Sequence, residues 1–171
     1  MRHRSAALAL VALLATPALA QTGSSVDIFA RGVAGLAENG SVIMGNLGKG
    51  TVRKVTVGAY EVQFAGSIAT ITFDEPVPCL FTQETVIQGQ PSTLVRFDFT
   101  RVESLQLGDQ GPYEDLNAIA LQLNGPEDIV QIFDAGGALK SVPAIASIVT
   151  SLTAADIEAA VVELRKACPA P

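Results

Sequence analysis

The acidic stretch of residues 98–134 carries the side chains best suited to bind a cation. It holds eight Asp and Glu residues against one basic residue. Within it, Asp109, Glu114 and Asp115 place three carboxylates around a Gly-Pro turn. Calcium prefers oxygen-rich, adaptable loops of this kind. The spacing matches no EF-hand, however, so we favour a solvated acidic loop and keep calcium as the alternative.

Two adjacent carboxylate pairs, Asp74 with Glu75 and Glu114 with Asp115, raise the alternative of a carboxylate-dependent hydrolase. Glycoside hydrolysis needs two carboxyl groups that flank the sugar. Neighbouring residues in a strand point to opposite faces, so neither pair converges by itself. The chain also has no Trp and only two Tyr to line a sugar-binding cleft. This hydrolase is the least favoured of the functions considered below.

The N-terminal residues 1–20 have the composition of a cleavable secretory signal peptide. A basic start precedes residues 6–15, an uncharged apolar run of the length expected for export. That run is shorter than the roughly 20 residues needed to span a bilayer. Ala18 and Ala20 then supply the small residues of a signal peptidase site. We therefore expect a bacterial protein of the periplasm or the extracellular space, without stable membrane insertion after cleavage.

Cleavage removes the only histidine, His3, together with two of the 11 basic residues and none of the 17 acidic ones. Without imidazole, the mature chain has no Ser-His-Asp or Cys-His mechanism and no His-ligated zinc. We therefore expect no catalytic residues and no cofactor other than calcium. The remaining net charge of −8 disfavours nucleic acid as a partner, because affinity for phosphate depends on Lys and Arg.

Two cysteines remain, Cys79 and Cys168, and an even number in an exported chain favours a disulfide. The bridge would join the middle of the chain to its end. The alternatives are two buried thiols or a redox pair, which the absence of a C-x-x-C motif disfavours. Closing a loop of this length stabilises the fold by roughly 4–5 kcal/mol in the chain-entropy account.

The elements that must position these residues are mostly strands. Apolar and polar residues alternate in residues 60–64, 69–73, 95–99 and 119–123, and residues 129–133 are expected to pair with the last of these. Asn39-Gly40 is a type I′ hairpin signal. Short strands with turns at this spacing predict an antiparallel sandwich or barrel over residues 21–150.

Two segments fit more than one element. Residues 26–36 have a helical apolar stripe, but Gly32 and Gly35 would each cost about 1 kcal/mol inside a helix, so we predict strands there. Residues 143–149 fit either a short helix or a final strand, and we favour the strand.

The C-terminal residues 151–171 form the one helix that the sequence predicts, docked on the β domain. Thr153 and Asp156 have the spacing of a capping box. Apolar residues then recur at helical spacing as far as Cys168, and Pro169 ends the pattern. Because Cys168 lies on the apolar face, a bridge to Cys79 would fasten this helix to the sheet.

The segment 33–64 resembles small secreted bacterial β-domains that combine an N/D-G hairpin with a G-x-Y-E-V-x-F strand, here residues 58–64. Such domains often carry a cysteine soon afterwards, as at Cys79, and a later F-D-x-x-G strand end, similar to residues 133–137. This chain departs from the pattern because its second cysteine lies on a terminal helix. The resemblance implies a β fold, and it implies neither a catalytic residue nor a function.

Three functions follow from these observations. The leading one is an exported, non-catalytic β-domain that acts as a binding or structural module of the envelope or extracellular space, with a protein or small-molecule partner. The second is a carrier that holds a small apolar ligand inside a closed barrel, with the cavity lined by Phe64, Phe73, Phe97 and Phe99. For these four side chains we favour an ordinary packed core over such a cavity. The hydrolase is third.

Overall fold

The computed structural model describes residues 24–134, 136–141 and 145–170. The predicted signal peptide, with Ala18 and Ala20, lies outside these residues, as do Pro143 and Ala144 of the expected final strand. The helices and strands, in chain order, are α1 (Ser25–Ala34), β1 (Ser41–Ile43), β2 (Lys49–Thr56), β3 (Ala59–Gln63), β4 (Ile68–Val77), β5 (Leu80–Ile87), β6 (Thr93–Asp98), β7 (Ser104–Tyr113), β8 (Leu116–Asn124), β9 (Val130–Phe133), β10 (Leu139–Ser141), β11 (Ile145–Thr150) and α2 (Ala154–Ala167).

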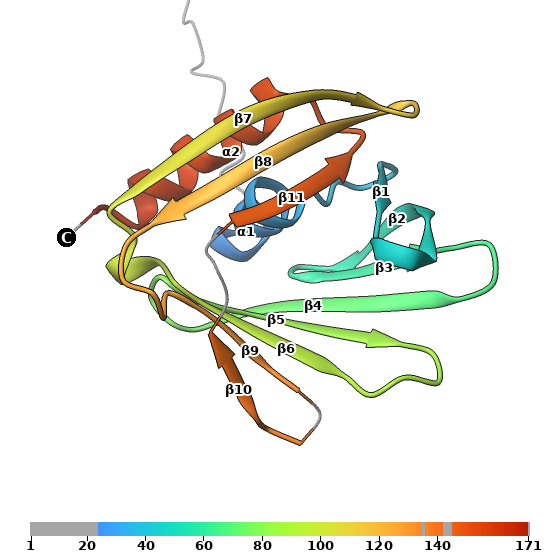
Figure 1. Ribbon diagram of the computed structural model, residues 1–171, viewed down its shortest axis with the longest axis horizontal. Coiled ribbons are helices and arrows are strands. Elements are labelled where there is room, and N and C mark those ends of the chain that lie inside the picture. Colours follow the sequence, from blue (N-terminus) through green and yellow to red (C-terminus); the bar gives the residue numbers. More distant parts are fainter. Residues whose placement is uncertain (1–23, 135, 142–144, 171) are drawn as a thin grey trace, which may run out of the picture.

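All the strands belong to one antiparallel sheet in the order β10-β9-β6-β5-β4-β3-β2-β1-β11-β8-β7. Figure 1 shows this sheet bent over, so that β11, β8 and β7 face the layer that contains β4, β5, β6 and β9. The three-residue strand β1 joins the two layers, and it meets β11 through the single pair Val42 and Thr150. The predicted mostly-β fold with a C-terminal helix is confirmed. Among the residues that the structure describes, β10 and β7 are the edges of the sheet and do not pair with each other, so the sheet does not close into a barrel.

Helix α1 lies between the two layers (Figure 1) and corrects the prediction of strands over residues 26–36. Its N-cap, Ser24, accepts a hydrogen bond from the backbone N–H of Asp27, and Gly35 ends it in the left-handed conformation at φ 67°. A Cβ at Gly32 would lie 3.3 Å from the Cβ of Ala160 on α2. Of the two glycines that argued against a helix, Gly35 therefore caps it and Gly32 lets α2 approach closely.

Two predicted strand connections are also wrong. Asn39-Gly40 joins α1 to β1 instead of closing a hairpin, and of its two residues only Asn39 has the positive φ that a type I′ turn requires at both. The first hairpin instead turns at residues 44–48, between β1 and β2. Strand β9 pairs with β6 and β10, not with β8, because the chain crosses from one layer to the other after β8.

The side chain of Phe29 on α1 is the centre of the aromatic core. It is fully buried and stacks on Phe81 of β5 with ring centroids 4.4 Å apart. It also meets Phe73, Phe97 and Phe99 edge to face, at 5.8, 5.0 and 5.7 Å. Offset and edge-to-face ring contacts of this kind add to the stabilisation from burial. The single side chain of Phe29 thus packs α1 against β4, β5 and β6.

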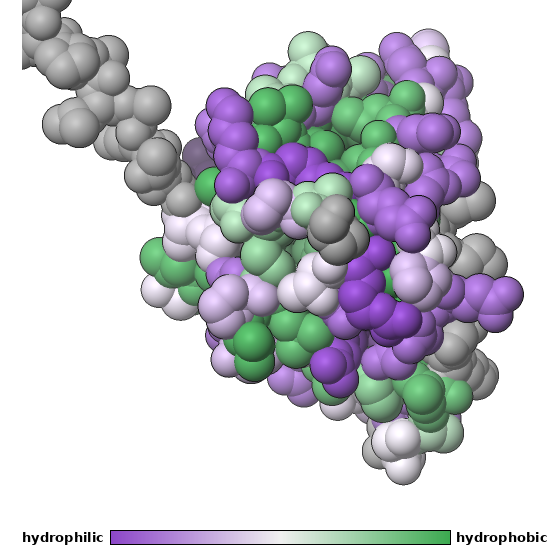
Figure 2. Space-filling view, turned by 90° about the vertical axis from the view of Figure 1, so that its left-hand side faces the viewer, coloured by the Kyte–Doolittle hydropathy of each residue, from purple (hydrophilic) through white to green (hydrophobic). Residues whose placement is uncertain are grey.

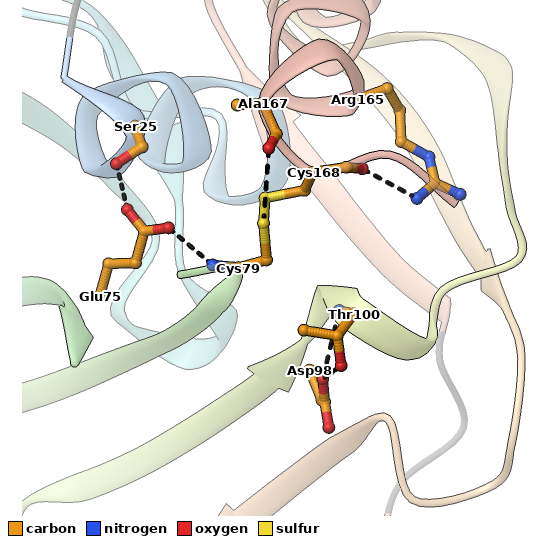
Figure 3. Close-up of a disulfide and its surroundings, with 8 residues drawn as sticks. All are labelled: Ser25, Glu75, Cys79, Asp98, Thr100, Arg165, Ala167 and Cys168. Carbon is orange, nitrogen blue, oxygen red and sulfur yellow. Dashed lines mark hydrogen bonds between the residues drawn. A yellow bond between two sulfur atoms is a disulfide. The ribbon is translucent and has the colours of Figure 1, made fainter. Parts of the chain in front are cut away.

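Helix α2 begins as predicted, with a complete capping box between Thr153 and Asp156. The predicted disulfide is also confirmed: Cys79 and Cys168 are bonded, with their Cα atoms 5.5 Å apart. Figure 3 shows the bridge joining the end of α2 to the turn between β4 and β5. Strand β11 confirms the expected final strand for the part of it that the structure describes.

Candidate functional site

The three carboxylates considered for calcium lie near the β7–β8 hairpin and do not form a ligand cluster. Asp109 sits on β7, where its Oδ1 accepts a hydrogen bond from the N–H of Gly111 at 2.8 Å. Glu114 is exposed in the turn, and Asp115 is ion-paired with Lys49 of β2. That pairing lowers the pKa of Asp115 below its ordinary value. The carboxylate of Asp115 is therefore already paired with the ammonium group of Lys49.

The two carboxylate pairs considered for a hydrolase lie in different hairpins. Asp74 is exposed near the end of β4, and its Oδ1 accepts from the N–H of Glu75. The carboxylate of Glu75 accepts hydrogen bonds from the hydroxyl of Ser25 and, at 2.7 Å, from the N–H of Cys79 (Figure 3). Figure 1 shows this hairpin end and the β7–β8 turn on opposite sides of the molecule. The pairs do not converge on one substrate.

Glu75 also belongs to the one group of three potential metal ligands found among the described residues, with Cys79 and Cys168. The two sulfur atoms are joined to each other in the disulfide. A metal would need them as separate thiolates. With the sulfur atoms joined, the Glu75 carboxylate links the turn between β4 and β5 to the first residue of α1, because it accepts hydrogen bonds from the N–H of Cys79 and from the Ser25 hydroxyl.

The surface in Figure 2 carries apolar residues in separate patches divided by hydrophilic ones. A groove of about 840 Å³ runs between β7 and α2, and charged side chains of both signs line it alongside apolar ones. Exposed apolar residues such as Val57 and Val77 lie on different hairpins. Scattered apolar residues of this sort are normal for protein surfaces.

A cavity of about 320 Å³ lies between the two sheet layers, beyond the C-terminal end of α1. Its inner part is made of core residues such as Leu36, Ile71 and Leu121, which are almost fully buried. Its outer part is made of half-buried residues, among them Gln83 and Ala146. Within the described ranges, the lining residues are Val33, Ala34, Leu36, Val42, Ile43, Met44, Ile71, Gln83, Val95, Phe97, Leu121, Leu123, Val130, Ile132, Ala146, Ser147, Ile148 and Val149.

The strand register decides which of these side chains point inward. Ala146 pairs with Leu121, which is fully buried, so both lie on the inner face. Ser147 pairs with Ala120 on the opposite face, so its hydroxyl points away from the cavity. Gln83 pairs with the buried Phe73 and shares the inner face with it. As far as the structure describes it, the inward-facing lining is therefore apolar apart from the amide of Gln83.

The sequence favoured a packed core of four phenylalanines over a cavity lined by them, and the structure places most of them in the packed core. Phe64, Phe73 and Phe99 are buried, and only Phe97 of the four lines the described cavity. The residues that were missed are smaller or polar, such as Ala146 and Gln83. The available signal was an inward strand position filled by a side chain too small or too polar for a packed core.

One partly buried polar cluster outside the cavity was also not predicted from the sequence. The Asp27 carboxylate accepts hydrogen bonds from Lys54 Nζ at 2.7 Å, from the N–H of Gly58 at 3.1 Å and from the Tyr60 hydroxyl at 2.9 Å. Burial alone would raise the pKa of Asp27, but these bonds outweigh it and hold that pKa below its ordinary value. Burial and the Asp27 carboxylate together raise the pKa of Tyr60. The cluster fixes the start of α1 against the β2–β3 hairpin.

The fold and the cavity define a β-rich domain in which a bent antiparallel sheet encloses a helix and an apolar hollow. No protein-family model, no curated protein and no solved structure matches the chain. Among the described residues, no helix is long and apolar enough to cross a membrane.

Proposed function

We propose that this protein is a non-catalytic binding protein, exported by the segment 1–20, that holds a small apolar molecule between its two sheet layers. The observation that carries the proposal is the cavity of about 320 Å³ with its almost wholly apolar inner lining. This volume lies at the lower end of the roughly 300–1,000 Å³ range of small-molecule sites. The sequence left open a binding or structural module and a carrier of a small apolar ligand. The cavity supports the carrier over a purely structural module.

The lining supports binding rather than chemistry. Its side chains are aliphatic and aromatic, with Met44 and Gln83 as the other inward-facing types. Burying apolar surface of a ligand against such walls stabilises the complex by about 25 cal/mol for each Å² removed from water. The cavity thus supplies affinity for an apolar body, and the lack of histidine in the mature chain supports the non-catalytic part of the proposal.

Export is supported by the sequence of residues 1–20 and is compatible with the disulfide. Disulfides persist in oxidising compartments such as the periplasm and the extracellular space. The bond between Cys79 and Cys168 would thus be stable where the signal peptide directs the chain.

Native mass spectrometry tests both the export and the carrier function. The full-length gene product is expressed in a bacterial host and recovered from its exported fraction. We expect a chain that begins at Gln21 and carries one bound small molecule, which organic extraction releases. Ala146→Leu, which places a larger side chain in the cavity, is expected to lose that molecule. Ala120→Leu, on the outer face of the neighbouring strand, is the matched control and keeps it.

Two results would contradict the proposal. A chain that retains residues 1–20 would refute export. A wild-type protein that is bare, and that also takes up no added apolar molecule such as n-decane or 1-nonanol, would refute the carrier function.

A further inference from the structure

We propose that the ligand is an uncharged amphiphile with one hydrogen-bonding group, and that this group meets the side-chain amide of Gln83. The inference rests on the proposed function and adds the chemical class of the ligand. Two features of the cavity carry it, the absence of charge from its described lining and the single polar side chain on its inner face.

The first feature is electrostatic. No Asp, Glu, Lys or Arg lines the cavity in the part of the chain that the structure describes. A carboxylate or an ammonium group that enters such a site loses its hydration, and no opposite charge replaces it. Uncharged ligands do not carry this cost. The cavity therefore discriminates between a neutral head group and a charged one attached to the same apolar chain.

The second feature is the position of Gln83. Its Nε2 donates a hydrogen bond to the Oγ1 of Thr85 at 3.3 Å, on the same face of β5. Within the described residues, no donor meets its carbonyl oxygen, so this acceptor and the second N–H of the amide are available to a ligand. Phe73 and Val95 occupy the facing positions on the two neighbouring strands. An amide placed among apolar side chains orients a ligand by its one polar group.

The size of the cavity limits the rest of the molecule. At about 30 Å³ for each water-sized heavy atom, a volume of about 320 Å³ holds on the order of ten heavy atoms. A medium-chain alcohol has this size, one hydrogen-bonding group and no charge. 1-Nonanol, nonanoate and n-decane are therefore matched probes that differ chiefly at the polar end.

The test is isothermal titration calorimetry of the disulfide-bonded mature protein with these three probes at pH 8, where nonanoate is ionised. We expect 1-nonanol to bind about three- to tenfold more tightly than n-decane, which corresponds to one neutral hydrogen bond. Nonanoate is expected to bind at least tenfold more weakly than 1-nonanol. Gln83→Met should remove the advantage of 1-nonanol over n-decane, whereas Gln131→Met, on the outer face of β9, should leave it unchanged.

The outcomes separate this inference from the proposed function. Equal binding of 1-nonanol and n-decane, unaffected by Gln83→Met, would overturn the role of Gln83 and leave the carrier function standing. Nonanoate that binds as tightly as 1-nonanol would overturn the selection for neutral head groups. If none of the three binds, the proposed function itself fails.

Discussion

The space between the two sheet layers is filled by packed side chains in one part and forms a cavity in another. In the filled part, the N-terminal half of α1 inserts Phe29 among Phe73 and Phe81. In the other part, beyond the end of the same helix, Ile71 and Gln83 line a cavity. These four strand residues belong to the same two strands: Phe73 and Ile71 to β4, Phe81 and Gln83 to β5.

The difference teaches that the length of α1, and not the pattern of the strands, decides where the cavity lies. Both parts have the same alternation of inward and outward residues. The helix stops at Gly35, where a Cβ would lie 2.4 Å from the Ile148 side chain. The left-handed backbone of Gly35, at φ 67°, turns the chain away at that point, and the inner faces of the strands beyond it border the cavity.

The largest effect on the filled part is expected from removal of the disulfide. Replacing Cys79 and Cys168 together by Ala should lower the free energy of unfolding by roughly 4–5 kcal/mol, because the unfolded chain regains the entropy of a long loop. Urea denaturation of the variant and the oxidised wild type measures this change. In the fraction that stays folded, binding to the cavity should persist. Unchanged denaturation midpoints would contradict this stabilisation by the bridge.

Phe29→Ala should lower the free energy of unfolding by about 3–5 kcal/mol, because it leaves a void among packed aromatic rings. Ile132→Ala is the matched truncation at the cavity. Ile132 is half-buried and already borders the cavity, so its truncation should cost less than half as much. Equal losses in urea denaturation would contradict the contrast between the packed part and the cavity.

The filled part could be predicted from the sequence only where the signals were local. Thr153, Asp156 and the helical spacing predicted α2, and the two cysteines predicted the bridge. Helix α1 could not be predicted with the same reasoning, because Gly32 is favourable only when Ala160 packs against it. That contact joins two helices more than a hundred residues apart in the sequence.

The alternation of the strands alone could not place the cavity, because it reports which face a side chain occupies and not what that side chain touches. Phe73 and Ile71 have the same inward pattern, yet one packs on Phe29 and the other borders the hollow. The exposed acidic residues suggested a calcium site because of their charge. In the structure, Asp115 is paired with Lys49, which lies 66 positions away in the sequence.

The Asp27 cluster anchors the filled part and gives it a pH dependence. Asp27→Asn should lower the free energy of unfolding at pH 7 by about 1–3 kcal/mol, because a partly buried, hydrogen-bonded carboxylate is lost. The folded pKa of Asp27 lies below its unfolded value, which is about 4. Its stabilisation is therefore complete above that value and is lost as the pH falls through the folded pKa.

Urea denaturation at pH 7 and pH 3 measures this dependence. The difference between wild type and Asp27→Asn should shrink at the lower pH. Asp74→Asn is the control, because the Asp74 side chain is exposed and accepts a bond only from the neighbouring N–H. It should change little at either pH. A difference for Asp27→Asn that grows at pH 3 would contradict the direction of the pKa shift.

The contrast between the two parts is tested most directly by one pair of matched enlargements, Ala160→Leu and Ala146→Leu. Ala160 is fully buried against Gly32, so the larger side chain should lower the free energy of unfolding by about 1–3 kcal/mol through overpacking. Ala146 faces the cavity, so the same change should leave that free energy unchanged or raise it, while it abolishes binding of 1-nonanol. If Ala146→Leu destabilises the protein as much as Ala160→Leu does, the space beyond α1 is packed and the carrier account is wrong.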